Sequence, residues 1–453
     1  MEVIDDVLAE QLVSDFVLPR YRAITRRHLE MLPQLSQLTA DDRIIMKAIA
    51  AVLPFRTNSY VMDELIDWNT IPDDPIYQLV FPQRGMLAPN DLACMVELMQ
   101  RDASPHEIEY AAHKIRMRLN PHPGGQLDLN VPTFRGKPLP GLQHKYSDTV
   151  LFFPRNGQTC HAYCNFCFRW AQFVGEPDLK IALNEAGLLH TYLSEHPEVT
   201  DLLITGGDPL IMKTKHLEHY IEPLLSLPSL QTIRIGTKAL AYWPYRFTTE
   251  EDADALLQLF KRVSDTGKQL AIMAHFTHPR ELSTREVHVA VSRAQEAGAV
   301  IKCQAPLARH INDSGEIWAE LWRTQVRMGL LPYYFFVERD TGPKNYFEVP
   351  LAQAYDIFRD AYERVADLNL NVYGPVMSAT PGKVMIDRID EIRGEKVFVL
   401  RFVRARNPAW INRPFFACFD PSATWLSDLV PAFGKQRFFF EDEMQVITQQ
   451  HCH

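Results

Sequence analysis

Hydrophobic and polar residues follow two different patterns along the chain, and the pattern changes near residue 148. Before this point, apolar side chains recur every three or four residues, which predicts amphipathic helices. Such stretches are residues 4–16, 44–53 and 105–119. After it, short apolar runs rich in branched residues alternate with helical patterns, which is typical of a parallel β/α architecture.

The second pattern predicts six strand–helix units in succession. The expected strands are residues 149–153, 201–204, 232–235, 270–276, 299–303 and 333–337. The expected helices lie near residues 183–195, 215–226, 250–265, 281–297, 315–328 and 350–367. Periodicity does not distinguish a barrel from an open sheet, but in both architectures functional residues gather where parallel strands end.

Two flanking segments lack this rhythm. Residues 120–142 are rich in proline and glycine, and we expect a linker or a draped loop there. After residue 370 we expect a loop at 377–383, followed by short strands at 384–386 and 397–402. The aromatic tail beyond residue 404 is expected to fold back onto the β/α unit instead of forming a separate core.

These boundaries divide the chain into three parts. They are a helical arm with its linker (1–142), a β/α unit (143–370) and a C-terminal segment (371–453). In the arm no reactive groups cluster, so we expect it to serve packing and contacts between subunits.

Composition narrows the class of protein. The chain has 453 residues, of which 46% are hydrophobic and 23% charged, as in ordinary globular proteins. Its net charge of -9 argues against a nucleic-acid-binding surface. The sequence has no apolar run of about 18 residues, so we expect no membrane helix. An acidic N-terminus and scattered additional cysteines favour a cytoplasmic protein.

Three cysteines, Cys160, Cys164 and Cys167, lie close together in the chain. Three thiolates on a four-iron cluster would leave one iron open to a small molecule. A zinc site with His161 as a fourth ligand and purely structural thiols are the alternatives. The C-x3-C-x2-C spacing resembles the signature of the radical S-adenosylmethionine (SAM) enzymes. In that class the open iron binds SAM, and one electron splits SAM to give a 5′-deoxyadenosyl radical.

Further candidate residues follow the predicted strand ends. They are Gly206, Gly207 and Asp208, then Lys238, His275, His278, Gln304 and Arg339. Glycines let a backbone approach a ligand closely. The two histidines lack the helical spacing of zinc ligands, so we expect hydrogen-bonding roles for them.

Two basic residues suggest binding of charged groups. Arg169 follows the last cysteine of the cluster motif and could hold a carboxylate through two parallel hydrogen bonds. Lys383 lies in a Pro-Gly-Lys turn and could form a Schiff base with an aldehyde cofactor if its surroundings lower its pKa. Taken alone, each could equally be an ordinary surface charge.

With these residues in place, the chain resembles the lysine 2,3-aminomutase family of radical SAM enzymes, which depend on pyridoxal phosphate (PLP). The likeness extends in order over roughly residues 55–390. The matching segments are residues 140–146, 203–208, 233–238, 275–279, 311–313 and 332–334, together with Gln304.

The resemblance implies a partial (β/α)6 barrel, similar to a TIM barrel, with an N-terminal helical arm and a C-terminal segment that carries the PLP lysine. It implies a [4Fe-4S] cluster on the three cysteines, with cofactor contacts from Gly206, Gly207, Asp208, His275 and Gln304. Lys383 would carry PLP, Lys145 would stand where the family has a phosphate-binding arginine, and Arg169 would hold the α-carboxylate of the substrate.

The implied reaction is an isomerisation in which the α-amino group of a free amino acid, held as a PLP imine, moves to the β-carbon. The radical from SAM takes a β-hydrogen and later returns it. The resemblance also implies an electron donor such as flavodoxin or ferredoxin, and a homo-oligomer. The alternative is a radical SAM lyase, a decarboxylase or a peptide- or protein-lysine-modifying enzyme on the same scaffold. A non-catalytic iron–sulfur or zinc protein is a third reading.

Several positions depart from the family pattern. Thr149 stands where a second phosphate-side arginine is expected, and the glycine run before Lys383 is shortened. Lysine-specific members use two aspartates to hold the distal ammonium. This chain has Arg339 at the first position, with Asp340 adjacent, and no acid near the second. A buried arginine would cost a lysine substrate on the order of several kcal/mol. We therefore expect an acidic or neutral, glutamate-like side chain.

Overall fold

The computed structural model describes residues 19–368 and 370–451. The helix expected within residues 4–16 lies outside them. The described chain forms an α/β fold around an 11-stranded mixed sheet, whose strands follow one another from β5 at one edge to β15 at the other. No helix in the described ranges is long and apolar enough to cross a membrane.

The parallel part of the sheet keeps the order of the chain. It consists of β6 (Thr149–Phe152), β7 (Asp201–Ile204), β8 (Thr232–Thr237), β9 (Gln269–His275), β10 (Val300–Leu307), β11 (Leu331–Val337) and β12 (Tyr373–Ser378). The first six were predicted, with ends that differ by a few residues. We did not predict β12, because Gly374 and Pro375 interrupt its apolar run and both residues disfavour strands.

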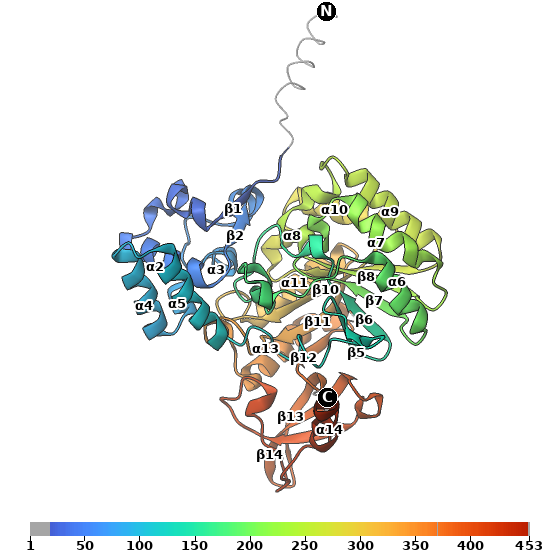
Figure 1. The fold of residues 1–453 in the computed structure, drawn as a ribbon. Helices are drawn as coiled ribbons and strands as arrows, with labels where there is room; N and C mark the ends of the chain where they lie inside the picture. Colours follow the sequence, from blue (N-terminus) through green and yellow to red (C-terminus); the bar gives the residue numbers. More distant parts are fainter. Residues whose placement is uncertain (1–18, 369, 452–453) are drawn as a thin grey trace, which may run out of the picture.

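Helices connect successive parallel strands. They are α6 (Ala186–Glu195), α7 (Thr214–Ile221), α8 (Ala239–Tyr242), α9 (Ala253–Asp265), α10 (Arg285–Glu296), α11 (Gly315–Arg327), α12 (Lys344–Phe347) and α13 (Leu351–Arg364). The apolar stripe of α9 is typical: Leu256, Leu259 and Phe260 are buried, at the spacing of one helix face. Figure 1 shows α6, α7, α9 and α10 along one outer side of the sheet.

In Figure 1 the helical arm lies to the left, on the opposite side of the view from α6, α7 and α9. It contains α2 (Ala40–Val52), α3 (Pro75–Val80), α4 (Pro89–Gln100), α5 (Pro105–Arg118) and the antiparallel pair β1 (Ala23–Thr25) and β2 (Arg56–Asn58). One buried cluster takes in Ile49 and Met95 of the arm as well as Leu202 and Ile235 of the sheet. The linker forms turns and a small hairpin, β3 (Thr133–Phe134) with β4 (Lys137–Pro138), before β5 (Leu142–Tyr146).

The C-terminal segment corrects two expectations. It continues the sheet as the antiparallel strands β13 (Gly382–Ile392), β14 (Glu395–Ala405) and β15 (Pro414–Cys418), and ends in α14 (Glu441–His451). Lys383 therefore lies on a strand and not in a loop. The tail also builds its own buried cluster around Trp410, Phe415 and Phe440, because its aromatic side chains have enough area to form one, and this cluster packs against Leu351.

Candidate active site

A cavity of about 370 Å³ opens where the parallel strands end. Its lining includes every residue to which the sequence analysis assigned a cluster, cofactor or substrate. They are Cys160, Cys164, Cys167, Lys145, Lys383, Gly206, Gly207, Asp208, His275, Gln304, Arg169 and Arg339. The cysteines, the Gly-Gly-Asp turn, His275 and Gln304 meet there as expected of the carboxyl ends of parallel strands. Lys145 and Lys383, which are 238 positions apart, reach the same hollow from the antiparallel strands β5 and β13.

The three cysteines lie on the loop after β6, and the arm fixes the path of this loop. The amide of Tyr163 donates to the carbonyl of Arg56 at 2.8 Å, and the amide of Asn165 donates to that of Leu79 at 2.8 Å. The side-chain amide of Asn165 donates to Gln78 and Phe81 at 3.0 and 2.7 Å. The arm therefore does more than pack: it positions the cysteine loop, which the sequence analysis missed.

The cysteine thiols face the cavity without converging on one point. Among the described residues, no three His, Cys, Asp or Glu side chains could hold a single metal ion. In a four-iron cluster each thiolate binds a different iron, so the sulfurs need not converge. His161, the alternative zinc ligand, packs its ring edge-on against Tyr21, 5.4 Å between centroids. Three cysteines that face one hollow from a well-anchored loop fit a cluster site.

The Gly-Gly-Asp turn after β7 is built against the cysteine loop. The amide of Asp208 donates to the carbonyl of Thr159 at 2.7 Å. A Cβ atom on Gly207 would lie 2.4 Å from that same carbonyl oxygen, so only glycine fits there. The Asp208 carboxylate accepts from the Thr237 hydroxyl at 2.7 and 2.8 Å and from the Lys238 amide at 2.8 Å. The Asp208 carboxylate, which follows β7, is thus hydrogen-bonded to the end of β8.

His275 and Gln304 meet at the ends of β9 and β10. The side-chain amide nitrogen of Gln304 lies 2.9 Å from Nε2 of His275, so this imidazole nitrogen accepts the bond and the ring is neutral. Burial lowers the pKa of His275 to about 3, and the positive charges of Lys238 and Arg169 act in the same direction. His278, by contrast, caps a helical turn by accepting from the Arg280 amide, and it does not line the cavity.

Lys383 reaches the cavity from β13. Its Nζ lies 4.0 Å from the centroid of the Tyr334 ring. Burial lowers the pKa of Lys383 to about 7, and the positive charges of Arg234 and Arg404 lower it further. A lysine with such a pKa is largely unprotonated near neutral pH, which is the form that attacks an aldehyde. The side chain therefore fits the carrier of an aldehyde cofactor.

Arg169 and Arg339 also line the cavity and have free hydrogen-bonding atoms. Among the described residues, Nη1 of Arg169 and Nε of Arg339 are buried without a hydrogen-bond partner. Burial lowers the pKa of Arg169 to about 10, with the charge of Arg339 adding to this effect. A Cβ atom on Gly124 would lie 2.6 Å from Nη2 of Arg339, so the linker packs closely on this guanidinium.

The acids of the cavity do not balance these cations. Asp201 is held by Arg234, with Nη2 at 2.6 Å and Nε at 2.7 Å. Burial raises the pKa of Glu338 well above its ordinary value, which disfavours the charged form of this side chain. Asp340 would take the place of the family's first aspartate if the alignment were moved by one residue, but it does not line the cavity. The cavity therefore presents uncompensated positive charge, which favours anionic ligands.

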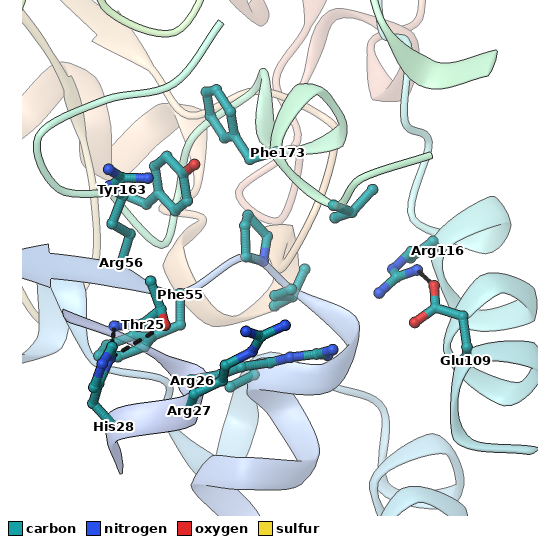
Figure 2. A pocket seen from close by; sticks show the side chains of 14 residues that line it. Thr25, Arg26, Arg27, His28, Phe55, Arg56, Glu109, Arg116, Tyr163 and Phe173 are labelled. Carbon is teal, nitrogen blue, oxygen red and sulfur yellow. Dashed lines mark hydrogen bonds and ion pairs between the residues drawn. The ribbon is translucent and has the colours of Figure 1, made fainter. Parts of the chain in front are cut away.

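A second cavity, of about 530 Å³, lies between the arm and the cysteine loop (Figure 2). Its basic residues include Arg26, Arg27 and His28, whereas Arg116 is held by Glu109 and Glu176. Tyr163 and Phe173 line both cavities, and their rings are stacked with centroids 4.4 Å apart. Because the cysteines and Lys383 line the first cavity, we assign the site to it.

Comparisons with known proteins give relatives of one kind. No protein-family model matches the chain. A protein of Aquifex aeolicus (strain VF5), provisionally named L-lysine 2,3-aminomutase, is 32% identical over 398 residues, which cover 87% of this chain and 92% of the relative. The L-lysine 2,3-aminomutase of Bacillus subtilis (strain 168) is 31% identical over 232 residues. That match covers 51% of this chain and 46% of the Bacillus protein.

Solved structures are more distant. A radical SAM methyltransferase from Sphaerobacter thermophilus matches with a TM-score of 0.36 and 16% identity. The match covers 52% of this chain and 68% of that chain.

Proposed function

Because the chain belongs to the lysine 2,3-aminomutase family, we propose that it moves the α-amino group of a free amino acid to the β-carbon, and that this amino acid has an acidic, glutamate-like side chain. The observation that carries the proposal is the content of one cavity. Three cysteines, an unusually acidic lysine and two partly unpaired guanidinium groups all face it.

We propose that the parallel strands form the partial (β/α)6 barrel of the radical SAM enzymes. The chain order of β6 to β11 and the helices between them support this architecture. In it, the cysteine loop and the Gly-Gly-Asp turn follow the first two strands, and all six strands contribute residues to the cavity lining, including Thr149 and Asp201 at the starts of β6 and β7.

The proposed cofactors are a [4Fe-4S] cluster, SAM and PLP. Cys160, Cys164 and Cys167 would hold the cluster, and Lys383 would hold PLP. When bound, the cluster with SAM supplies a hydrogen-abstracting radical, and PLP supplies delocalisation of the unpaired electron. An electron donor such as flavodoxin or ferredoxin and assembly into a homo-oligomer belong to the same proposal.

The protein's own contribution is positioning and charge. Arg169 and Arg339 would orient an amino acid by pairing its two carboxylates, since a guanidinium matches a carboxylate through two parallel bonds. The neutral His275 and Gln304 offer hydrogen bonds without adding charge. Phe168 and Phe153 cover the guanidinium of Arg169 and keep water from it, which strengthens its pairing with an anion.

The choice of an acidic over a basic substrate follows from the charges. A lysine ammonium would face Arg339 and meet acids that are either paired, as Asp201 is, or disfavoured in their charged form by burial, as Glu338 is. A carboxylate would find unpaired N–H donors on Arg339. Burial of an unpaired charge costs several kcal/mol, so the difference between the two substrates is large.

The test is anaerobic turnover. The protein is reconstituted with iron, sulfide and PLP, supplied with SAM and a reductant, and incubated with a mixture of amino acids. Chromatography with mass spectrometry should show the β-isomer of an acidic amino acid. Formation of β-lysine would contradict the acidic specificity. Deoxyadenosine without any β-isomer would favour the lyase, decarboxylase or peptide- and protein-lysine-modifying alternatives.

A further inference from the structure

We propose that Arg404, together with Lys145, binds the phosphate group of the aldehyde cofactor, and that it supplies from β14 the cation that β6 lacks at Thr149. This inference rests on the proposed function, because it requires the cofactor to be held on Lys383. Arg404 was not among the residues predicted from the sequence.

The hairpin of β13 and β14 brings Arg404 to the site. Its turn is Arg393-Gly394, with φ of 58° and 77°, which is the conformation that hairpins with two-residue turns favour. The register places Arg404 directly opposite Lys383. Residues that are directly opposite in an antiparallel pair project from the same face of the sheet. Both side chains line the cavity, so the amine and the guanidinium reach it side by side.

Arg404 reaches the position where an arginine is missing. Its Nη2 donates to the hydroxyl of Thr149 at 3.1 Å and pairs with Asp148. These two contacts fix one corner of the guanidinium plane. Within the part of the chain that the structure describes, Nε and Nη1 of Arg404 have no hydrogen-bond partner. The guanidinium is thus held in place by the start of β6 while its remaining donors stay available.

Lys145 completes the subsite from β5. Its Nζ lies 5.5 Å from the centroid of the Tyr146 ring, and Cζ of Arg404 lies 4.9 Å from the same centroid. Lys145 also donates to the carbonyl of Ala379, just before β13, at 2.5 Å. The two cations are therefore grouped about one ring, next to the strand that carries Lys383.

The charges of this group favour a dianion. Burial lowers the pKa of Lys145 well below its ordinary value, and the positive charges of Arg406, Arg339 and Lys383 lower it further. Asp148, the acid that pairs with Arg404, is partly exposed, with a side-chain exposure of 46%. Closely spaced cations without buried counter-charges are stabilised by a ligand that carries two negative charges. A phosphate has that charge and accepts bonds from several donors at once.

The inference can be tested by comparing PLP with pyridoxal, which lacks the phosphate. Both probes are titrated into the full-length apo-protein, and binding is read from the absorbance of the adduct. Borohydride reduction and peptide mass spectrometry then locate the adduct on Lys383. For Arg404→Gln, compared with wild type at a pH above the Lys383 transition of both proteins, we expect PLP affinity to fall about 10- to 100-fold, the usual effect of losing a hydrogen bond to a charged group, with pyridoxal affinity unchanged.

Two further variants separate binding from folding. Arg401→Gln is the matched control, because Arg401 lies on the same strand but bonds Asp387 and Asn412 and does not line the cavity. Asp148→Asn keeps Arg404 and removes its ion pair. We expect Arg401→Gln to leave PLP binding unchanged, and Asp148→Asn to weaken it less than Arg404→Gln does, because Arg404 keeps its charge and its bond to Thr149.

The outcomes distinguish this inference from the proposed function. Equal weakening of PLP and pyridoxal by Arg404→Gln, or no weakening of either, would overturn the role of Arg404 alone. If Asp148→Asn weakens PLP as much as Arg404→Gln does, the ion pair and not the phosphate explains the effect, which also overturns it. If the wild-type protein forms no adduct at Lys383, the proposal that Lys383 holds PLP is wrong. The wild-type titration alone gives this result, without any variant.

Discussion

The guanidinium groups of Arg169 and Arg339 lie over the same aromatic ring, that of Phe168, with their Cζ atoms 4.9 and 4.8 Å from its centroid. Two cations that share one ring repel each other, and the attraction of each to the ring offsets part of that repulsion. An anion placed against each guanidinium would remove the rest. The arrangement therefore supports the proposed substrate, which carries two carboxylates.

The first prediction concerns Arg339. Arg339→Gln should raise the KM for the proposed acidic substrate about 10- to 100-fold, because one charged hydrogen-bond donor is lost from a buried site. The KM for SAM should not change. Arg327→Gln, an exposed substitution on α11, serves as the control. An unchanged KM for the amino acid would mean that Arg339 does not contact the substrate.

The second prediction is a pH dependence of cofactor attachment. The pKa of Lys383 is lowered to about 7, first by burial and then by the charges of Arg234 and Arg404. The rate at which PLP attaches to the apo-protein should therefore rise through about pH 7 and level off above it. Arg404→Gln removes one nearby positive charge, so the midpoint should move to higher pH. A rate that is independent of pH from about pH 6 to about pH 9 would contradict this.

The same shift affects stability. Between about pH 7 and the ordinary pKa of lysine, the folded apo-protein keeps Lys383 neutral while the unfolded chain binds a proton there. The unfolded state thus binds more protons, so the free energy of unfolding contributed by this group rises with pH across that window. Lys383→Met should remove this dependence, and denaturant unfolding at several pH values would measure the loss.

A third prediction uses two glycines with different surroundings. Gly207→Ala would place a Cβ 2.4 Å from the backbone oxygen of Thr159, where no side chain can move aside. We expect it to destabilise the fold by roughly 2 kcal/mol or more and to lower the iron content after reconstitution. Gly187→Ala, in α6 with no atom within 4 Å of the new Cβ, should instead stabilise by about 0.5–1 kcal/mol. Thermal unfolding of both variants checks the contrast.

Local sequence patterns were sufficient where neighbouring residues determine the structure. The alternation of apolar runs predicted β6 to β11, and the cysteine spacing predicted the loop that faces the cavity. The strand β12 was missed because its packing between β11 and β13, and not its own propensity, holds it in the sheet. The intrinsic strand propensity of a segment predicts its structure poorly when contacts with neighbouring strands hold it in the sheet.

The missed parts of the site depend on pairing between distant segments. Arg404 looks like any charged residue of an alternating strand until β13 and β14 are aligned. Counting outward from the Arg393-Gly394 turn places Arg404 opposite Lys383, but only because two register shifts, one on each strand, offset each other. The contacts of Arg56 and Leu79 with the cysteine loop had no such signal, because backbone carbonyls of any residue type can accept those bonds.

The last prediction concerns the cluster and Tyr242, a buried residue of α8. Its hydroxyl lies 3.3 Å from Sγ of Cys164. When Cys164 binds iron as a thiolate, it has no proton to give, so the tyrosine must be the donor. Such a bond stabilises the more negative, reduced cluster, and potentials depend on hydrogen bonds to the sulfurs. Tyr242→Phe should therefore shift the midpoint potential of the reconstituted cluster to a more negative value.

A potential is the appropriate measurement because a merely structural role of Tyr242 would leave it unchanged. Tyr245→Phe is the matched control, since Tyr245 lies three residues after Tyr242 but packs on Tyr60 and Trp243, and among the described residues its side chain makes no hydrogen bond to a cysteine. Anaerobic redox titration followed by electron paramagnetic resonance gives the potentials. Equal potentials in wild type and Tyr242→Phe would show that the hydroxyl does not donate to the cluster ligand.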